Sequence, residues 1–196
     1  MIYKILLNLI KIFFKIFFPF SVYGANNTKN IKNGFILCSN HISNLDPLFI
    51  LVSYGKKTYF LGKYELFKHK ILSIFFKKVG VIPIKRGKND QNALKETENI
   101  LLNKKVVVIF IEGARSKTGE FLRPKSGAAR IAQRVDVPIV PVCIIPNKKT
   151  GIKLFKNTKI IFGEPIVVSK LEFEKIHVIS EYIMQRIINL KNEVII

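Results

Sequence analysis

Residues 106–116, V-V-V-I-F-I-E-G-A-R-S, contain the clearest structural pattern of the chain. The run from Val106 to Ile111 consists of β-branched and aromatic residues, which predicts a strand that is buried on both faces. Such strands belong to parallel sheets covered by helices on both sides. The polar turn that begins at Glu112 follows the carboxyl end of this strand, where open α/β sheets bind their ligands.

Short apolar runs alternate with longer helical patterns on both sides of this strand. Further strands are predicted at residues 34–39, 58–61, 79–84, 137–145 and 159–162. Helices are predicted at 47–54, 64–76, 91–102, 126–134 and 171–190. Prolines 138 and 141 predict that the strand over 137–145 is bulged or lies at a sheet edge. The alternation predicts an α/β fold, a mostly parallel mixed sheet flanked by helices.

The first twenty residues predict an amphipathic helix that lies in the membrane surface. A polar stripe of Lys4, Asn8, Lys11 and Lys15 interrupts an otherwise apolar, phenylalanine-rich segment. Lysines through the middle of the segment disfavour a spanning helix, and they also disfavour the alternative of a secretory signal peptide. A helix packed against the protein is the other alternative. We therefore divide the chain into a membrane-associating helix, 1–24, and a single catalytic-size domain, 25–196.

The chain of 196 residues carries 33 Lys and Arg against 13 Asp and Glu, a formal net charge of +20. This excess predicts a negatively charged partner, such as anionic lipid, a phosphorylated substrate or nucleic acid. A general lysine-rich composition is the alternative, because the lysines do not collect in one tail. No zinc-finger spacing or RNA-recognition motif is present, so we expect no nucleic-acid partner.

Cysteine and histidine are too sparse and too scattered to form a metal cage. Cys38 and Cys143 each lie in an apolar run, where a reduced, buried thiol is the usual state, and a disulfide framework is excluded. The histidines at 41, 69 and 177 are far apart in the sequence. We therefore predict neither a metal site nor a tightly bound cofactor.

A first polar cluster follows the strand at 34–39. It reads N-H-I-S-N-L-D-P over residues 40–47. His41 and Asp46 are too far apart in angle to meet on one helix, but a turn at Ser43-Asn44 would bring them together. His41 would then act as a general base oriented by Asp46. The alternative is that Asp46 caps the next helix ahead of Pro47 and leaves His41 as an incidental loop residue.

Three further clusters suit an anionic ligand. Arg86 lies in a cationic turn that follows the strand at 79–84, where its guanidinium could bind a phosphate or a carboxylate. The alternative is that Arg86 is a solvated surface charge. Glu112 and Arg115 flank Gly113 in a turn that either holds a phosphate or forms an internal ion pair. Lys125 precedes a helix whose first N–H groups also suit an anion.

Taken together, these clusters resemble the motifs of the PlsC-type glycerolipid acyltransferases. The matching blocks are, in order, N-H-x-x-x-x-D at Asn40, His41 and Asp46; G-x-I-x-I-x-R at 81–86; E-G-x-R-S at 112–116; and V-P-I-V-P-V at 137–142. The resemblance covers roughly residues 35–170. Where the third block often reads F-P-E-G-T-R-S, this chain has Ile111 and Ala114, which bears on substrate preference rather than on the reaction.

The resemblance implies transfer of an acyl group from a thioester to the sn-2 hydroxyl of lysophosphatidic acid, which gives phosphatidic acid. It assigns His41 as the general base and Asp46 as its orienting partner. The implied acceptor-binding residues are Arg86, Glu112, Gly113, Arg115, Ser116 and Lys125. The implied residues of the acyl side are Val137, Pro138 and Ile139.

The donor implied by the resemblance is acyl-CoA or acyl carrier protein loaded with an acyl group, and the location is the cytoplasmic face of the cell membrane, where the lipid acceptor resides. Another lysolipid or glycerol 3-phosphate is the alternative acceptor. A non-catalytic basic lipid-binding protein is a further alternative. A serine hydrolase built on Ser43 or Ser116 is disfavoured, because the chain has no G-x-S-x-G nucleophile elbow.

Overall fold

The computed structural model describes residues 2–85, 90–146, 152–173 and 175–193. Its strands are β1 (Phe20–Tyr23), β2 (Phe35–Ser39), β3 (Thr58–Lys63), β4 (Val81–Ile84), β5 (Val106–Phe110), β6 (Ile139–Ile145) and β7 (Thr158–Phe162). Its α-helices are α1 (Ile2–Phe17), α2 (Asp46–Tyr54), α3 (Lys70–Lys78), α4 (Gln91–Leu102), α5 (Gly127–Val135) and α6 (Ile176–Glu193). Three short 3-10 helices complete them: η1 (Ala25–Thr28), η2 (Tyr64–Phe67) and η3 (Val168–Lys170).

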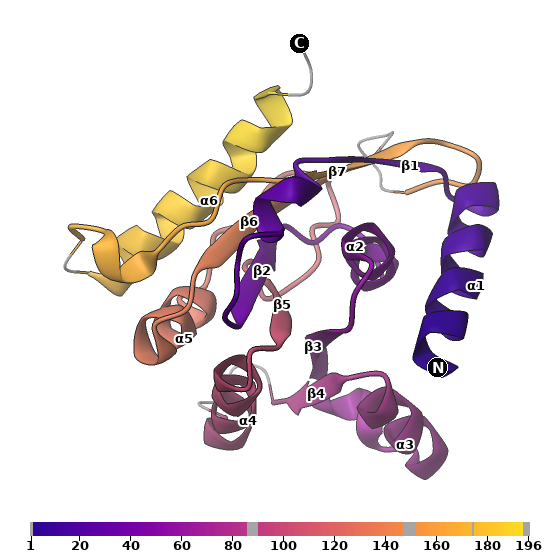
Figure 1. Ribbon diagram of the computed structural model, residues 1–196, viewed down its shortest axis with the longest axis horizontal. Coiled ribbons are helices and arrows are strands. Elements are labelled where there is room, and N and C mark those ends of the chain that lie inside the picture. The colour runs from indigo at the N-terminus through magenta and orange to yellow at the C-terminus, as the bar shows by residue number, and fades with distance from the viewer. Residues whose placement is uncertain (1, 86–89, 147–151, 174, 194–196) are drawn as a thin grey trace.

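The strands form one mixed sheet in the order β1-β7-β6-β2-β5-β3-β4. All neighbouring pairs are parallel except β6 and β7. Helices α4, α5 and α6 cover one face, and α1 and α2 cover the other (Figure 1). This arrangement confirms the predicted α/β class and its mostly parallel sheet.

The two central strands are buried on both faces, as the run of β-branched residues predicts. In β5, Val107 and Ile109 join the core under α5 and α6, whereas Val106 and Val108 join the core under α2. The neighbouring strand β2 divides its side chains in the same way, and all five of its residues are buried. Burial on both faces explains why these strands are continuously apolar instead of alternating.

The structure differs from the sequence predictions at β1 and β6. Residues 20–23, which we assigned to the membrane helix, pair with β7 as a strand of the sheet, so the sheet extends across the boundary predicted at residue 24. β6 is interior despite Pro138 and Pro141, because it lies between β7 and β2. Pro141 occurs where the pairing with the β7 side is interrupted, between the Ile139–Ile166 bridge and the Val142–Phe162 pair. The missing N–H therefore falls in a gap of the ladder, which is the bulged arrangement that prolines permit.

The chain leaves β2 and β5 toward opposite faces of the sheet. β2 leads into α2, whose Phe49 and Ile50 pack on one face, whereas β5 leads toward α5, whose Ala128 and Ile131 pack on the other. Because the two strands are parallel neighbours, their carboxyl ends open a crevice between the diverging connections. The polar segments 40–45 and 111–126 both emerge at this crevice.

α1 is attached to the domain along one edge and exposed along another. Leu7 and Phe14 are buried, and the Phe14 ring meets Phe49 of α2 edge-on, with 4.9 Å between ring centroids. Leu9, Ile12, Phe13 and Ile16 are each about half exposed. Both the packing role and an outward apolar face are therefore present in this helix. No helix in the described part of the chain has the length and apolarity needed to span a membrane.

Replacing Phe14 by Ala should lower the free energy of unfolding by about 3 kcal/mol, because the ring is 2% exposed and leaves a cavity against α2. Phe13→Ala is the matched control, since its ring is 49% exposed, and should cost less than about 1 kcal/mol. Urea unfolding of both variants measures the difference. Equal losses would mean that α1 does not dock through Phe14.

Candidate active site

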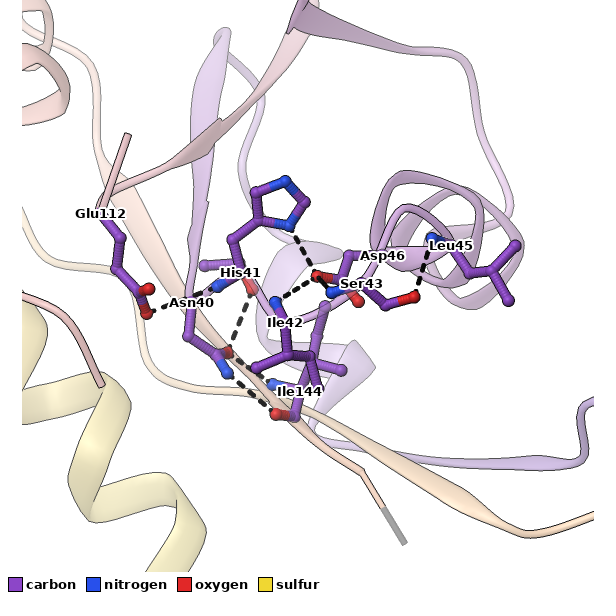
Figure 2. Close-up of polar contacts among 9 residues, drawn as sticks. Asn40, His41, Ile42, Ser43, Leu45, Asp46, Glu112 and Ile144 are labelled. Carbon is purple, nitrogen blue, oxygen red and sulfur yellow. Dashed lines mark hydrogen bonds and ion pairs between the residues drawn. The ribbon is translucent and has the colours of Figure 1, made fainter. Parts of the chain in front are cut away.

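His41 and Asp46 meet at the carboxyl end of β2. The Nδ1 atom of His41 lies 2.7 Å from Oδ2 of Asp46 (Figure 2). The same carboxylate oxygen accepts hydrogen bonds from the backbone N–H groups of Ile42 (2.7 Å) and Ser43 (2.8 Å). The segment between the two residues is therefore a turn wrapped around one carboxylate oxygen, which closes the five-residue separation.

Asp46 does not cap the following helix. It is the first residue of α2, and its side chain turns back into the loop and makes no capping hydrogen bond. The carboxylate is fully buried, and His41 is 8% exposed. The alternative in which Asp46 is a cap and His41 an incidental loop residue is wrong for this structure.

The contact with Asp46 fixes the tautomer and the plane of the His41 ring. An ionised carboxylate only accepts hydrogen bonds, so Nδ1 of a neutral imidazole carries the proton and Nε2 keeps its lone pair. The ring also stacks on Phe110, with centroids 4.0 Å apart and planes 16° from parallel. These two contacts leave Nε2 as the free basic atom of a side chain that lines a cavity.

Asn40 ties the same loop to β6. Its Nδ2 donates to the carbonyl oxygen of Ile144 at 2.9 Å, and its Oδ1 accepts from the Ile144 N–H at 2.8 Å. The side-chain amide thus pairs with the backbone as a neighbouring strand would, just beyond the end of β2 (Figure 2). Both bonds are buried, so losing them would leave unsatisfied backbone groups.

Glu112 supports His41 from the side opposite Asp46. Its Oε1 accepts the backbone N–H of His41 at 3.4 Å, and Figure 2 shows the two carboxylates on either side of the His41 backbone. Glu112 is 3% exposed. Burial raises the pKa of its carboxyl to about 7, against the lowering effect of the His41 and Leu122 backbone N–H groups. The side chain is not among the residues that line the cavity, so the structure makes it a support for the His41 backbone.

A cavity of about 1130 Å³ opens in front of His41. Its cationic lining consists of Lys63, Arg115 and Lys117, and no carboxylate stands among the described lining residues. The apolar lining comes from several elements and includes Leu7, Ile10, Leu48, Leu51, Phe60, Leu66, Phe76 and Val81. A largely apolar cavity that is lined by His41 and by three cationic side chains suits a lipid with an anionic headgroup.

The remaining predicted acceptor-binding residues occupy different positions. Arg115 and Ser116 line the cavity, and Ser116 donates its N–H to the His41 carbonyl oxygen at 2.8 Å. Gly113 has a φ of +68° and donates its N–H to Phe110, so it makes the turn that redirects the chain after β5. Lys125 is exposed, and its backbone N–H binds Ile111. Arg86 lies outside the described residues.

The three residues predicted for the acyl side do not line this cavity. Val137 and Ile139 are buried in the core under α5 and α6. Pro138, between them, accepts the Ile36 N–H through its carbonyl oxygen. The apolar side of the cavity is built instead by residues of α1, α2, β3, η2, α3, β4 and β5.

The sequence interpretation missed Phe110, Lys63 and the α1 residues Leu7 and Ile10 as parts of the site. Phe110 looks like an ordinary strand residue, and only the turn after it places its ring against His41. Leu7 and Ile10 belong to a helix far away in the sequence, and nothing in the local pattern indicates that it borders the crevice.

Two other kinds of chemistry find no support in the described residues. No cluster of three or more His, Cys, Asp or Glu side chains is placed to hold a metal ion in the described part of the chain. The described serine hydroxyls near the site bind elsewhere: Oγ of Ser43 accepts the Leu45 N–H, and Oγ of Ser116 accepts the Gly119 N–H. Neither is arranged as a nucleophile on His41.

Several known proteins are similar to this chain. A family model described as acyltransferase matches residues 19–145. A 1-acyl-sn-glycerol-3-phosphate acyltransferase of Bacillus subtilis is 28% identical over 198 residues, covering 97% of this chain and 98% of that protein. The chloroplastic 1-acyl-sn-glycerol-3-phosphate acyltransferase of Arabidopsis thaliana is 30% identical over 80% of this chain, which spans only 46% of that relative.

A solved structure is also similar. The crystal structure of the 1-acyl-sn-glycerophosphate acyltransferase PlsC from Thermotoga maritima matches with a TM-score of 0.76 and 25% sequence identity. The match covers 96% of this chain and 80% of that one. The similarity therefore extends over the sheet, the crevice and the helices around it.

Glu112 should make the stability of the protein depend on pH. The folded state holds the Glu112 proton more tightly than the unfolded chain, because burial raises the pKa from 4.5 to about 7. The stability that this group contributes is therefore present below pH 4.5 and lost as the pH rises toward 7. Between pH 5 and pH 8, we expect wild type to lose about 2 kcal/mol relative to Glu112→Gln.

Denaturant unfolding at both pH values tests this expectation, with the exposed Glu120→Gln as the matched control. The control should follow wild type. A constant difference between wild type and Glu112→Gln across this pH range would contradict a buried carboxyl with a raised pKa.

Proposed function

The chain belongs to the acyltransferase family, and we propose that it transfers an acyl group from a thioester to the free hydroxyl of a 1-acyl-sn-glycerol 3-phosphate. The observation that carries this proposal is the His41–Asp46 pair at a cavity whose lining is largely apolar and includes the cationic side chains Lys63, Arg115 and Lys117. The names of the relatives in Bacillus subtilis and Thermotoga maritima support the same reaction.

In the proposed reaction, Nε2 of His41 removes the proton of the acceptor hydroxyl while the oxygen attacks the thioester carbonyl carbon. Asp46 stabilises the imidazolium that results. The tetrahedral intermediate then collapses, the carbon–sulfur bond breaks, and the imidazolium gives its proton to the thiolate that leaves. The products are the diacylated glycerophosphate and a free thiol, and no acyl-enzyme is formed.

The charges of the cavity suggest how the acceptor is oriented. Arg115 offers a two-pronged donor to the phosphate, and Lys63 and Lys117 add positive charge nearby. Arg86 is predicted to add a second guanidinium. The apolar lining accommodates acyl chains, so one cavity holds the headgroup close to His41 and the chains away from water.

The donor is an acyl thioester carried by coenzyme A or by acyl carrier protein, because both present the same reacting group. Other lysolipids and glycerol 3-phosphate carry a comparable hydroxyl and an anionic group, so they belong in the same assay as competing acceptors.

The proposed location is the cytoplasmic face of the cell membrane, where the lipid acceptor resides. The support comes from α1, whose Leu9, Ile12, Phe13 and Ile16 follow helical spacing and form an exposed apolar strip. Lys11 and Lys15 are exposed beside it. An apolar strip flanked by lysines fits a helix that lies in the surface of an anionic membrane.

The direct test is acyl transfer by purified protein in lipid vesicles, with lysophosphatidic acid as acceptor and each thioester as donor. Wild type should form phosphatidic acid, and His41→Ala should be slower by about 10³-fold because the general base is gone. His177→Ala is the matched control, since His177 is exposed on α6, away from the crevice. Normal turnover by folded His41→Ala, or no product from wild type with either donor, would overturn the proposal.

A further inference from the structure

The segment from η2 through α3 exposes more apolar surface than its packing requires. The exposed fractions are 46% for Tyr64, 44% for Leu66, 83% for Ile71 and 60% for Ile74. We call these four residues the η2–α3 patch. Large apolar side chains gathered on one short segment of the surface mark an interaction site more often than chance exposure does.

The inner face of α3 already has its packing partners. Phe76 contacts Phe67 of η2, with ring centroids 5.8 Å apart, and lines the cavity. Ile71 and Ile74 are three residues apart and therefore share a face, which points away from the cavity. Folding of the domain accounts for Phe76 but not for two isoleucines in solvent.

The charges around the patch indicate what covers it. Residues 63–78 contain the lysines 63, 68, 70, 77 and 78, all exposed, and Glu65 is their only acidic residue. Glu65 lies 4.0 Å from Lys63, so the other lysines surround the patch without an acidic neighbour in this segment. Isoleucines bordered by lysines suit the surface of a bilayer. The isoleucines can contact acyl chains, and the lysines can contact anionic headgroups.

The position of the patch connects it to the proposed reaction. Leu66 and Phe76 line the same cavity as Leu7 and Ile10 of α1. α1 and α3 lie on the same side of the molecule, away from α5 and α6 (Figure 1). The cavity is thus bordered by two segments that each carry exposed apolar residues and lysines.

We propose that the η2–α3 patch is a second membrane-docking surface, which inserts Ile71 and Ile74 into an anionic bilayer beside the cavity. This inference rests on the proposed function and adds a contact to the one assigned to α1. With both segments on the membrane, the cavity faces the bilayer between them, and a lysolipid passes from the lipid layer to His41 without crossing water.

The chain contains no tryptophan, so a single introduced tryptophan reports its own surroundings. We would place one at the patch (Ile71→Trp) and, as the matched control, one on α4 (Leu102→Trp), where the native leucine is 61% exposed. The probes are phosphatidylglycerol–phosphatidylcholine vesicles with brominated acyl chains and without acyl acceptor. Both positions are exposed, so both variants should fold.

The emission of Ile71→Trp should shift to the blue and be quenched by the brominated lipid, whereas Leu102→Trp should not change. An unchanged Ile71→Trp on vesicles that do bind the protein would overturn the inference and leave α1 as the membrane contact. Equal quenching at both positions would also overturn it, because it would indicate nonspecific adsorption.

Lysine substitutions test the electrostatic part. Lys77→Gln with Lys78→Gln should weaken binding to the anionic vesicles by roughly tenfold, whereas Lys29→Gln with Lys32→Gln, two exposed lysines in the connection from η1 to β2, should weaken it less. If both pairs of substitutions weaken binding equally, the lysines act only through the net charge of the protein, and the inference is overturned.

Acyl transfer in detergent micelles separates this inference from the proposed function. Ile71→Trp and the Lys77→Gln/Lys78→Gln variant should keep wild-type turnover there, because Ile71, Lys77 and Lys78 do not line the cavity. No turnover by wild type in micelles would count against the proposed function, while the tryptophan result would still decide the inference.

Discussion

One buried carboxylate oxygen organises the site. Oδ2 of Asp46 accepts hydrogen bonds from the backbone N–H groups of Ile42 and Ser43 and contacts Nδ1 of His41. A single atom therefore closes the turn between β2 and α2 and orients the base. These hydrogen bonds to Oδ2 offset part of the hydration that the fully buried carboxylate loses, and its other oxygen, Oδ1, has no partner in the described part of the chain. Asn40 and Glu112 fix the same loop on its other sides, through Ile144 and through the His41 N–H. The position of Nε2 thus depends on the fold of the whole crevice.

The sheet gives this loop its setting. β2 and β5 are parallel neighbours whose connections diverge, which opens the crevice, and their side chains anchor separate cores on the two faces. The face that carries α1 and α2 also borders the cavity, so the packing of Phe14 on Phe49 and the shape of the cavity are linked. The helix α1 therefore has three roles. Its inner edge packs on the domain and stabilises it, Leu7 and Ile10 line the cavity, and its other edge presents an apolar strip to the outside.

The parts of the structure that depend on local pattern were predictable from sequence. Continuous β-branched runs indicate β5 and β2 because burial on both faces requires apolar residues at every position. The sequence indicated that a turn between His41 and Asp46 could form. Whether Asp46 orients His41 or caps the next helix depends on the direction of its carboxylate, which only the structure shows. The position of Pro141 was not predictable from local pattern. A proline has no N–H to donate within a sheet, and only the structure shows that the pairing with the β7 side is interrupted at this residue, so that an interior strand can contain it. The cavity walls were not predictable, because residues of α1 and α3, far apart in the sequence, line one cavity only in the folded chain.

The Asp46→Asn variant separates the proposed role of Asp46, which is to act through His41, from its role in the fold. We would measure kcat and KM for acyl transfer to lysophosphatidic acid together with the free energy of unfolding. We expect a folded protein whose kcat falls by about 10³-fold with little change in KM, because the acceptor still binds while the imidazole loses its orienting charge. A folded variant with a kcat close to that of wild type would contradict the proposed role.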